Sequence, residues 1–106
     1  MTLYRQGDVA LRGIDKLPTN LIEVQRDNGA VVLAYGEVTG HSHALRGARV
    51  ALFMDTGSGS GRRYLKVDEP SDLSHEEHST ITLPAGLYEV LGQVEYTPAE
   101  IRRVAD

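Results

Sequence analysis

The chain has 106 residues, a length typical of one globular domain. Hydrophobic residues make up 41% of it and charged residues 25%, which are ordinary values for a folded protein and exclude disorder along the whole length. Eleven Lys and Arg against fifteen Asp and Glu give a net charge of −4, which argues against tight binding to nucleic acid. The lack of cysteine excludes a disulfide scaffold, an iron–sulfur cluster, a Cys-ligated zinc and a Cys nucleophile.

The chain also lacks the sequence features of a membrane or secreted protein. Its apolar runs, such as residues 50–54, are far shorter than the roughly 20 residues that a membrane-spanning helix needs. The first eight residues carry no basic segment followed by an apolar stretch, so they do not resemble a signal peptide. We therefore expect a soluble cytoplasmic protein in which residues 1–106 form a single domain with no membrane partner.

Most of the chain is predicted to form short β-strands separated by turns. The strand-like runs lie at residues 9–14, 21–26, 30–35, 41–45, 48–54, 62–67, 80–83 and 87–91. Within 48–54, Val50, Leu52 and Met54 share one face by strand alternation. Seven or eight strands without a long helical period predict an all-β domain, either a β-barrel or a sandwich.

Turn signals separate several of these runs. Asn28-Gly29 lies between two apolar runs and predicts a hairpin, because both central residues of a type I′ turn need positive φ. Pro-Ala-Gly at 84–86 predicts a second tight turn, with Gly86 supplying positive φ. Gly-Ser-Gly-Ser-Gly at 57–61 predicts a flexible loop inside the domain.

One short helix is predicted at the C-terminus. Thr-Pro-Ala-Glu at 97–100 is a capping box with proline at the first helical position. Ile101 and Val104 follow at a spacing of three, so they share one face of the helix and can pack it against the β domain.

All four histidines fall in two tight pairs, which are the clearest functional signal in the sequence. His41 and His43 are two residues apart, so on a strand both point from the same face and can reach one metal ion. His75 and His78 are three apart and need a turn of helix to converge, which the capping box that begins at Ser74 can supply.

Carboxylates close to these pairs add candidate site residues. Glu37 precedes the first pair and is a candidate fourth ligand, a partner that orients an imidazole, or a solvated strand residue. Glu76 and Glu77 lie between the members of the second pair, and either is a candidate general base toward a metal-bound water. As an alternative, each of the three is an ordinary surface charge.

Neutral imidazole suits a divalent transition metal such as Zn, Fe, Ni or Mn, and Cu is also compatible with it. The predicted ligands are His41, His43, His75, His78 and Glu37. The alternative is that the histidines are solvated or hydrogen-bonded residues that hold no metal.

A resemblance to a known family follows from the same residues. Gly-His-Ser-His at 40–43, together with His78 and Leu-Pro-Ala-Gly-Leu-Tyr at 83–88, resembles the two-motif layout of the cupin superfamily. In that family the second-motif histidine follows the Pro-x-Gly turn, whereas here it precedes the turn. The resemblance implies a small β-barrel with one divalent metal, held by His and one Glu, and an activity among dioxygenases, isomerases or decarboxylases. Segments 4–9, 36–43 and 75–78 also resemble a group of short uncharacterised bacterial and phage-type proteins.

These observations support three hypotheses about function. The first is a small cupin-like metalloenzyme that acts on a small molecule, with Glu76 or Glu77 as base. The second is a non-catalytic, metal-stabilised module for binding or assembly with a larger protein partner. In the third, the histidines bind no metal and serve in partner recognition. An open coordination position favours the enzyme, and a closed four-ligand shell or a site between the subunits of a homo-oligomer favours the structural role.

Overall fold

A computed structural model describes residues 2–35, 41–57 and 61–91. These residues form an all-β fold of ten strands, which confirms the predicted fold class at this level. The strands are β1 (Leu3–Gln6), β2 (Val9–Ile14), β3 (Leu21–Val24), β4 (Val31–Tyr35), β5 (Ser42–Leu45), β6 (Val50–Asp55), β7 (Arg63–Val67), β8 (Ser71–Ser74), β9 (Ile81–Leu83) and β10 (Gly86–Leu91). No helix in the described residues is long and apolar enough to cross a membrane.

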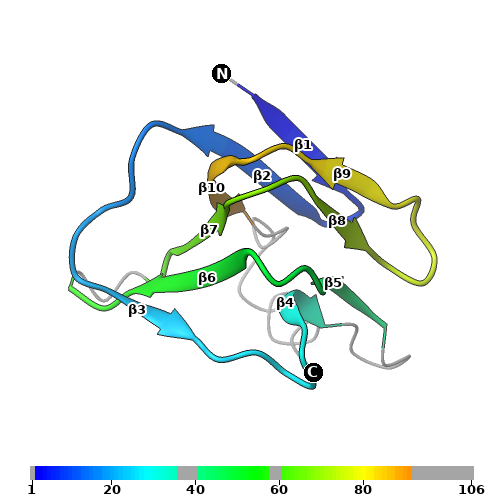
Figure 1. Cartoon of the computed structure of the whole chain (residues 1–106), viewed down its shortest axis with the longest axis horizontal. Coiled ribbons are helices and arrows are strands. Elements are labelled where there is room, and N and C mark those ends of the chain that lie inside the picture. The colour runs from blue at the N-terminus through cyan, green and yellow to red at the C-terminus, as the bar shows by residue number, and fades with distance from the viewer. Residues whose placement is uncertain (1, 36–40, 58–60, 92–106) are drawn as a thin grey trace, which may run out of the picture.

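The strands divide into two antiparallel sheets (Figure 1). One sheet has six strands in the order β1-β2-β10-β7-β6-β3, and the other has four in the order β4-β5-β8-β9. The predicted barrel is therefore not found among the described residues, because the strands do not close into one continuous ladder. The predicted helix at 97–104 and the candidate ligand Glu37 lie outside the described residues.

The two sheets share one apolar core. Strand alternation places a leucine from most strands on the inner face of its sheet, where its burial stabilises the fold by about 2 kcal/mol. The larger sheet contributes Leu11, Leu52 and Leu65, and the smaller contributes Leu33, Leu45, Leu73 and Leu83, all at most 2% exposed. Buried leucines from both sheets thus hold the two sheets together.

The turn at Asn28-Gly29 forms as predicted, but the hairpin around it does not. Asn28 and Gly29 have φ values of 51° and 80°, and Asp27 and Ala30 form a single bridge across them. Beyond that bridge the chains separate, because β3 pairs with β6 whereas β4 pairs with β5 in the other sheet. The turn therefore connects the two sheets.

Arg26 stabilises this crossing between the sheets. Its guanidinium donates hydrogen bonds to three backbone carbonyl oxygens, those of Gly29 at 3.0 Å, Gly47 at 2.6 Å and Val50 at 2.8 Å. The planar fork of an arginine suits such a set of acceptors, since its five N–H donors are fixed in one plane. The Asn28-Gly29 turn is thus tied to the connection between β5 and β6.

The predicted tight turn at 84–86 is wrong in its details. Gly86 is not among the glycines with positive φ and is instead the first residue of β10. β9 pairs with β8 in the smaller sheet, whereas β10 pairs with β2 and β7 in the larger one. The segment crosses between sheets, and the Tyr88 hydroxyl donates a hydrogen bond of 2.6 Å to the Pro84 carbonyl oxygen at the crossing.

Two strands were not predicted from the sequence. β1 pairs with β2 through a two-residue turn at Gly7-Asp8, in which Gly7 has a φ of 56°. β8 carries the sequence Ser-Asp-Leu-Ser, and its one large apolar residue, Leu73, is fully buried. Each of these strands ends next to the histidines, β1 at Gln6 and β8 at Ser74.

Candidate functional site

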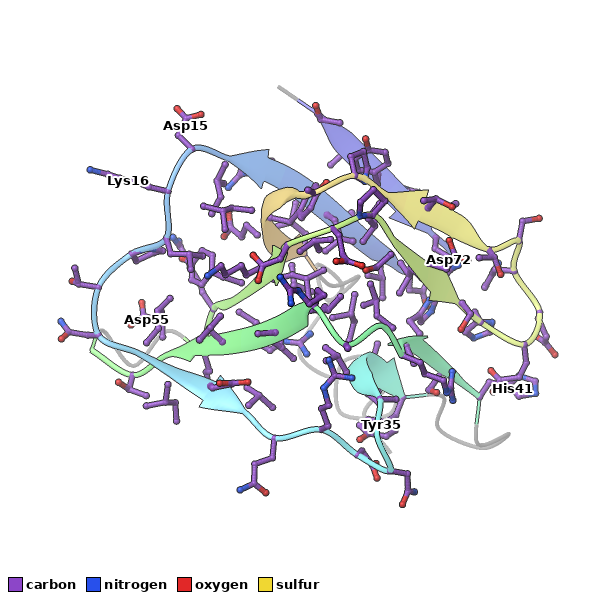
Figure 2. The ribbon with its side chains drawn as sticks, in the orientation of Figure 1. Asp15, Lys16, Tyr35, His41, Asp55 and Asp72 are labelled. Atoms are coloured by element: carbon purple, nitrogen blue, oxygen red, sulfur yellow. The ribbon has the colours of Figure 1, made fainter. Side chains whose placement is uncertain are left out.

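The pairing of β5 with β8 brings the two histidine pairs together. His43 lies in β5, and His41 comes just before that strand. Ala44 is opposite Ser74 in the antiparallel register, so His43 and His75 come next to each other where β8 ends. Figure 2 shows His41 at the end of the molecule opposite Asp15 and Lys16. The site therefore lies at one end of the smaller sheet.

The four imidazole rings form one cluster. The ring centroids are 4.3 Å apart for His43 and His75, and 4.6 Å apart for His75 and His78. The His41 ring is 5.6 Å from that of His75, and the His78 ring is 5.8 Å from that of His43. His75 is thus the central member, in contact with the other three.

The second pair reaches the cluster without the predicted turn of helix. Residues 76–78 form a bend after β8, and no helix is found there. The Ser74 side chain does not cap a helix, since its hydroxyl donates a 3.2 Å hydrogen bond to the Ala44 carbonyl oxygen in β5. The bend turns the chain back, so side chains three residues apart converge even though a straight strand would separate them.

His43 is the buried member of the cluster and is held by Gln6. His43 is 6% exposed, and its Nδ1 lies 2.8 Å from Oε1 of Gln6. The Gln6 amide nitrogen donates to the carbonyl oxygens of Leu73, at 2.8 Å, and Ser79, at 2.9 Å. Gln6 is 3% exposed and thus joins the end of β1 to β5, β8 and the following segment.

The surroundings of His43 favour its neutral form. Burial, followed by repulsion from the imidazoles of His75 and His78, lowers the pKa of His43 to about 4, although Asp8 and Glu76 act in the opposite direction. At neutral pH this imidazole is therefore uncharged, which is the state in which histidine binds a metal ion.

The two glutamates of the segment have different surroundings. An oxygen of Glu76 accepts a 3.0 Å hydrogen bond from the backbone nitrogen of Ser42, and this bond lowers the pKa of Glu76. Glu77 is exposed, and its Oε2 lies 3.6 Å from Nδ1 of His41. The Glu77 backbone nitrogen also donates a 3.0 Å hydrogen bond to Nδ1 of His75. Glu76 is therefore fixed at the start of β5, and Glu77 lies against two of the imidazoles.

One set of potential ligand atoms is close enough to share a metal ion. His41, His75 and Glu76 each offer one such atom, and these atoms all lie within 4.8 Å of one another. His43 and His78 lie beside this set through their contacts with His75. Four of the five predicted ligands are thus gathered in one place, together with Glu76, which the sequence suggested only as a base.

Gly7 forms one wall of the cluster. A Cβ atom at this position would lie 2.5 Å from Nε2 of His78, too close for any side chain without movement of the ring. The sequence did not indicate a site role for Gly7 or Gln6, because their contacts lie far along the chain. Nothing in the sequence around Gln6 and Gly7 indicates that histidines from distant segments pack against them.

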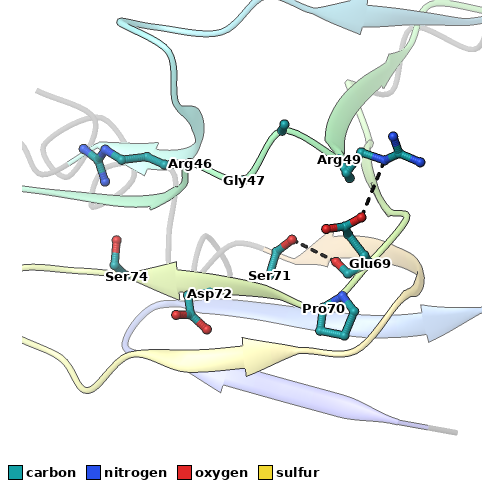
Figure 3. Close-up of a pocket in the computed structure, with 9 residues that line it drawn as sticks. Arg46, Gly47, Arg49, Glu69, Pro70, Ser71, Asp72 and Ser74 are labelled. Atoms are coloured by element: carbon teal, nitrogen blue, oxygen red, sulfur yellow. Dashed lines mark hydrogen bonds and ion pairs between the residues drawn. The ribbon is translucent and has the colours of Figure 1, made fainter.

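Two clefts in the described residues lie away from the histidines. One, of about 360 Å³, follows the connection between β5 and β6, and Figure 3 shows Arg49 directed at Glu69 across it. Its lining is Arg46, Gly47, Ala48, Arg49, Glu69, Pro70, Ser71, Asp72 and Ser74. A second cleft, of about 590 Å³, lies beside Tyr4 and Tyr88. The histidine cluster is the stronger candidate site, because it gathers four imidazoles and a carboxylate in one place.

Comparison with known proteins gives a family but no activity. A family model described as a domain of unknown function, DUF8820, matches residues 5–93. The match covers most of the chain, so the chain belongs to this family. It fits the resemblance to uncharacterised proteins and gives no support to the resemblance to cupins. Neither the curated proteins nor the solved structures contain a match to the chain.

Proposed function

We propose that this domain binds one divalent transition metal ion, such as Zn, Fe, Ni or Mn, at the histidine cluster. The observation that carries the proposal is the convergence of all four histidines of the chain from two segments, with the centroids of neighbouring rings 4.3–5.8 Å apart. Clusters of neutral imidazoles with one carboxylate suit such ions, and a buried histidine with a lowered pKa is ready to bind without first losing a proton.

The distances favour His41, His75 and Glu76 as ligands. His43 and His78, whose rings pack beside that of His75, are the candidates for a fourth ligand. Nδ1 of His75 accepts a hydrogen bond from the Glu77 backbone, so neutral His75 carries its proton on Nε2. A metal ion that binds Nδ1 of His75 therefore replaces this hydrogen bond, whereas a metal ion that binds Nε2 displaces the proton. Glu77 then orients His41 through their contact.

The test is the metal content of tag-free protein after reconstitution and dialysis, measured by elemental analysis beside a His41→Ala/His75→Ala double variant. We expect about one equivalent in the parent protein and a strong loss in the variant. Glu76→Gln and Glu77→Gln form a matched pair of neighbouring exposed carboxylates. Glu76→Gln should weaken binding more, because Glu76 supplies a ligand atom. A parent protein that takes up no metal would refute the proposal and favour partner recognition by the histidines.

A second candidate function is catalysis at the same metal, supported by the exposure of one side of the cluster. Glu76 is exposed, and the His41 side chain is 27% exposed, so a metal there would be in contact with water. An open coordination position would allow the metal to polarise a substrate oxygen or to activate water. Azide added to Co²⁺-loaded protein tests this, because binding at an open position changes the visible spectrum. An unchanged spectrum would favour the closed, structural site.

A further inference from the structure

We infer that Gln6 is a positioning residue that fixes the proton of His43 on Nδ1 and leaves Nε2 as the metal-binding atom. The inference rests on the proposed metal site and adds to it the ligand atom of His43 and the residue that selects it. It follows from the hydrogen bonds of one buried amide.

The orientation of the Gln6 amide is determined by its partners. The carbonyl oxygens of Leu73 and Ser79 can only accept hydrogen bonds, so the group that faces them must be the NH₂ of Gln6. The oxygen of the amide then faces His43 at 2.8 Å, and Nδ1 of His43 must donate to it. The reversed amide would place three oxygens together and leave all of them without a proton.

The remaining nitrogen of His43 is left with its lone pair. In a neutral imidazole with the proton on Nδ1, Nε2 carries none. The described residues include no fully buried side-chain nitrogen or oxygen that lacks a hydrogen bond, and the bond of His43 to Gln6 uses Nδ1. Nε2 of His43 is therefore not a sealed atom without a partner, and its ring lies 4.3 Å from that of His75 and 5.8 Å from that of His78, measured between ring centroids.

His75 has the opposite arrangement, which makes the inference specific. Its Nδ1 accepts a hydrogen bond from the Glu77 backbone nitrogen, so the neutral ring carries its proton on Nε2. The two rings are 4.3 Å apart but are held in different tautomers by different partners. A nonspecific polar environment would give mixtures in both rings, and only directed hydrogen bonds give one tautomer in each.

The closing experiment reads the tautomers directly. Long-range ¹H–¹⁵N correlation spectra of tag-free, metal-free protein at pH 7 should show the Nδ1–H form of His43 and the Nε2–H form of His75. After addition of Zn²⁺, the ¹⁵N resonance of His43 Nε2 should shift and the Nδ1 proton should stay in place. Gln6→Met should give mixed tautomers of His43 and a 10–100-fold loss of Zn²⁺ affinity, the range known for partners of metal-binding histidines. Gln25→Met, at an exposed position, is the matched control and should change neither.

The outcomes separate this inference from the proposed function. An Nε2–H or mixed His43 in the metal-free parent protein overturns the inference, and so does Zn²⁺ binding that leaves Nε2 of His43 unshifted, although the metal site would stand in both cases. If Zn²⁺ does not bind at all, the proposed function fails, and the assignment of Nε2 as ligand fails with it. Because the parent spectra require no substitution, a Gln6→Met variant that does not fold leaves these tests intact.

Discussion

The contact between Gly7 and His78 allows a test with a matched control elsewhere in the fold. Gly7 and Gly29 both lie in two-residue turns with positive φ, of 56° and 80°. A Cβ atom at Gly7 would lie 2.5 Å from Nε2 of His78, whereas one at Gly29 would have no atom within 4 Å. Alanine therefore introduces the same kind of backbone strain at both positions but displaces a histidine at only one.

The expected losses of stability and of Zn²⁺ affinity follow from the backbone strain and from the displaced histidine. Left-handed backbone costs an L-residue about 1 kcal/mol, so Gly29→Ala should lower the free energy of unfolding by about that amount and leave metal affinity unchanged. Gly7→Ala carries the same cost and also forces the His78 ring to retreat by about 1 Å to reach an ordinary contact of about 3.5 Å. Ligand distances at a metal site tolerate only about 0.2 Å, and the His78 ring lies 4.6 Å from that of the proposed ligand His75, so Zn²⁺ affinity should fall by about tenfold or more.

Urea unfolding of the metal-free proteins gives the stability change, and competition with a chromophoric chelator gives the Zn²⁺ affinity. The ¹⁵N resonances of His78 report whether the ring has moved. If the two variants lose the same stability, keep the same Zn²⁺ affinity and leave His78 unshifted, the close packing of Gly7 on His78 is refuted. Parallel losses of Zn²⁺ affinity in both variants would show that a general loosening of the fold is responsible.

Three further predictions concern stability. The pKa of His43 is lowered to about 4 in the folded protein from about 6.5 in the unfolded chain, so the unfolded state binds the proton first as the pH falls. Between about pH 6.5 and pH 4 the titration of His43 should therefore lower the free energy of unfolding of the metal-free protein by about 2 kcal/mol, after allowance for screening by water. Urea unfolding across this range should show a slope that is reduced in His43→Gln, and an equal slope in both would contradict the assignment. Arg26→Ala should lower the free energy of chemical unfolding by about 2–3 kcal/mol, because three carbonyl oxygens lose their donor. The control Arg49→Ala removes only an exposed ion pair and should cost less than about 1 kcal/mol. Equal effects of the two substitutions would argue against the link that Arg26 makes between the sheets. Tyr88→Phe should lower the melting temperature through the loss of about 1 kcal/mol from its bond to Pro84, and an unchanged temperature would mean that this bond contributes nothing.

Local sequence patterns predicted most strands but not which strands pair. The run at 9–14 coincides with β2, and the Asn28-Gly29 turn has the expected positive φ values. The strand pairing expected across the turns at 28–29 and 84–86 does not form, because both segments cross between sheets and join strands that have other partners. Turn chemistry sets the local direction of the chain. The partners of a strand depend on which residues share the core, and no short window of sequence contains that information.

The candidate site was predicted in part for a similar reason. All four histidines lie in two short segments, which indicates one candidate site, and the β5–β8 register brings their rings together. Their function as metal ligands stays a prediction. Gln6 gave no signal, since its partners are 37, 67 and 73 residues away. The sequence offers Glu76 as a base or a surface charge, and it predicts a turn of helix where the structure has the bend that brings Glu76 to the backbone of Ser42.

The position of the cluster couples the proposed metal site to the stability of the whole domain. The histidines come from β5 and from the segment after β8, and Gln6 connects both to β1 in the other sheet. A ligand that binds only the folded state at 100 times its dissociation constant stabilises that state by about 2.7 kcal/mol, against a total stability of about 5–15 kcal/mol for a typical domain. Since the unfolded chain separates these segments, most of a metal's affinity would depend on the two sheets being in place. A structural contribution would therefore accompany any chemistry at this site, and only an open coordination position would show that the metal does more than hold the sheets together.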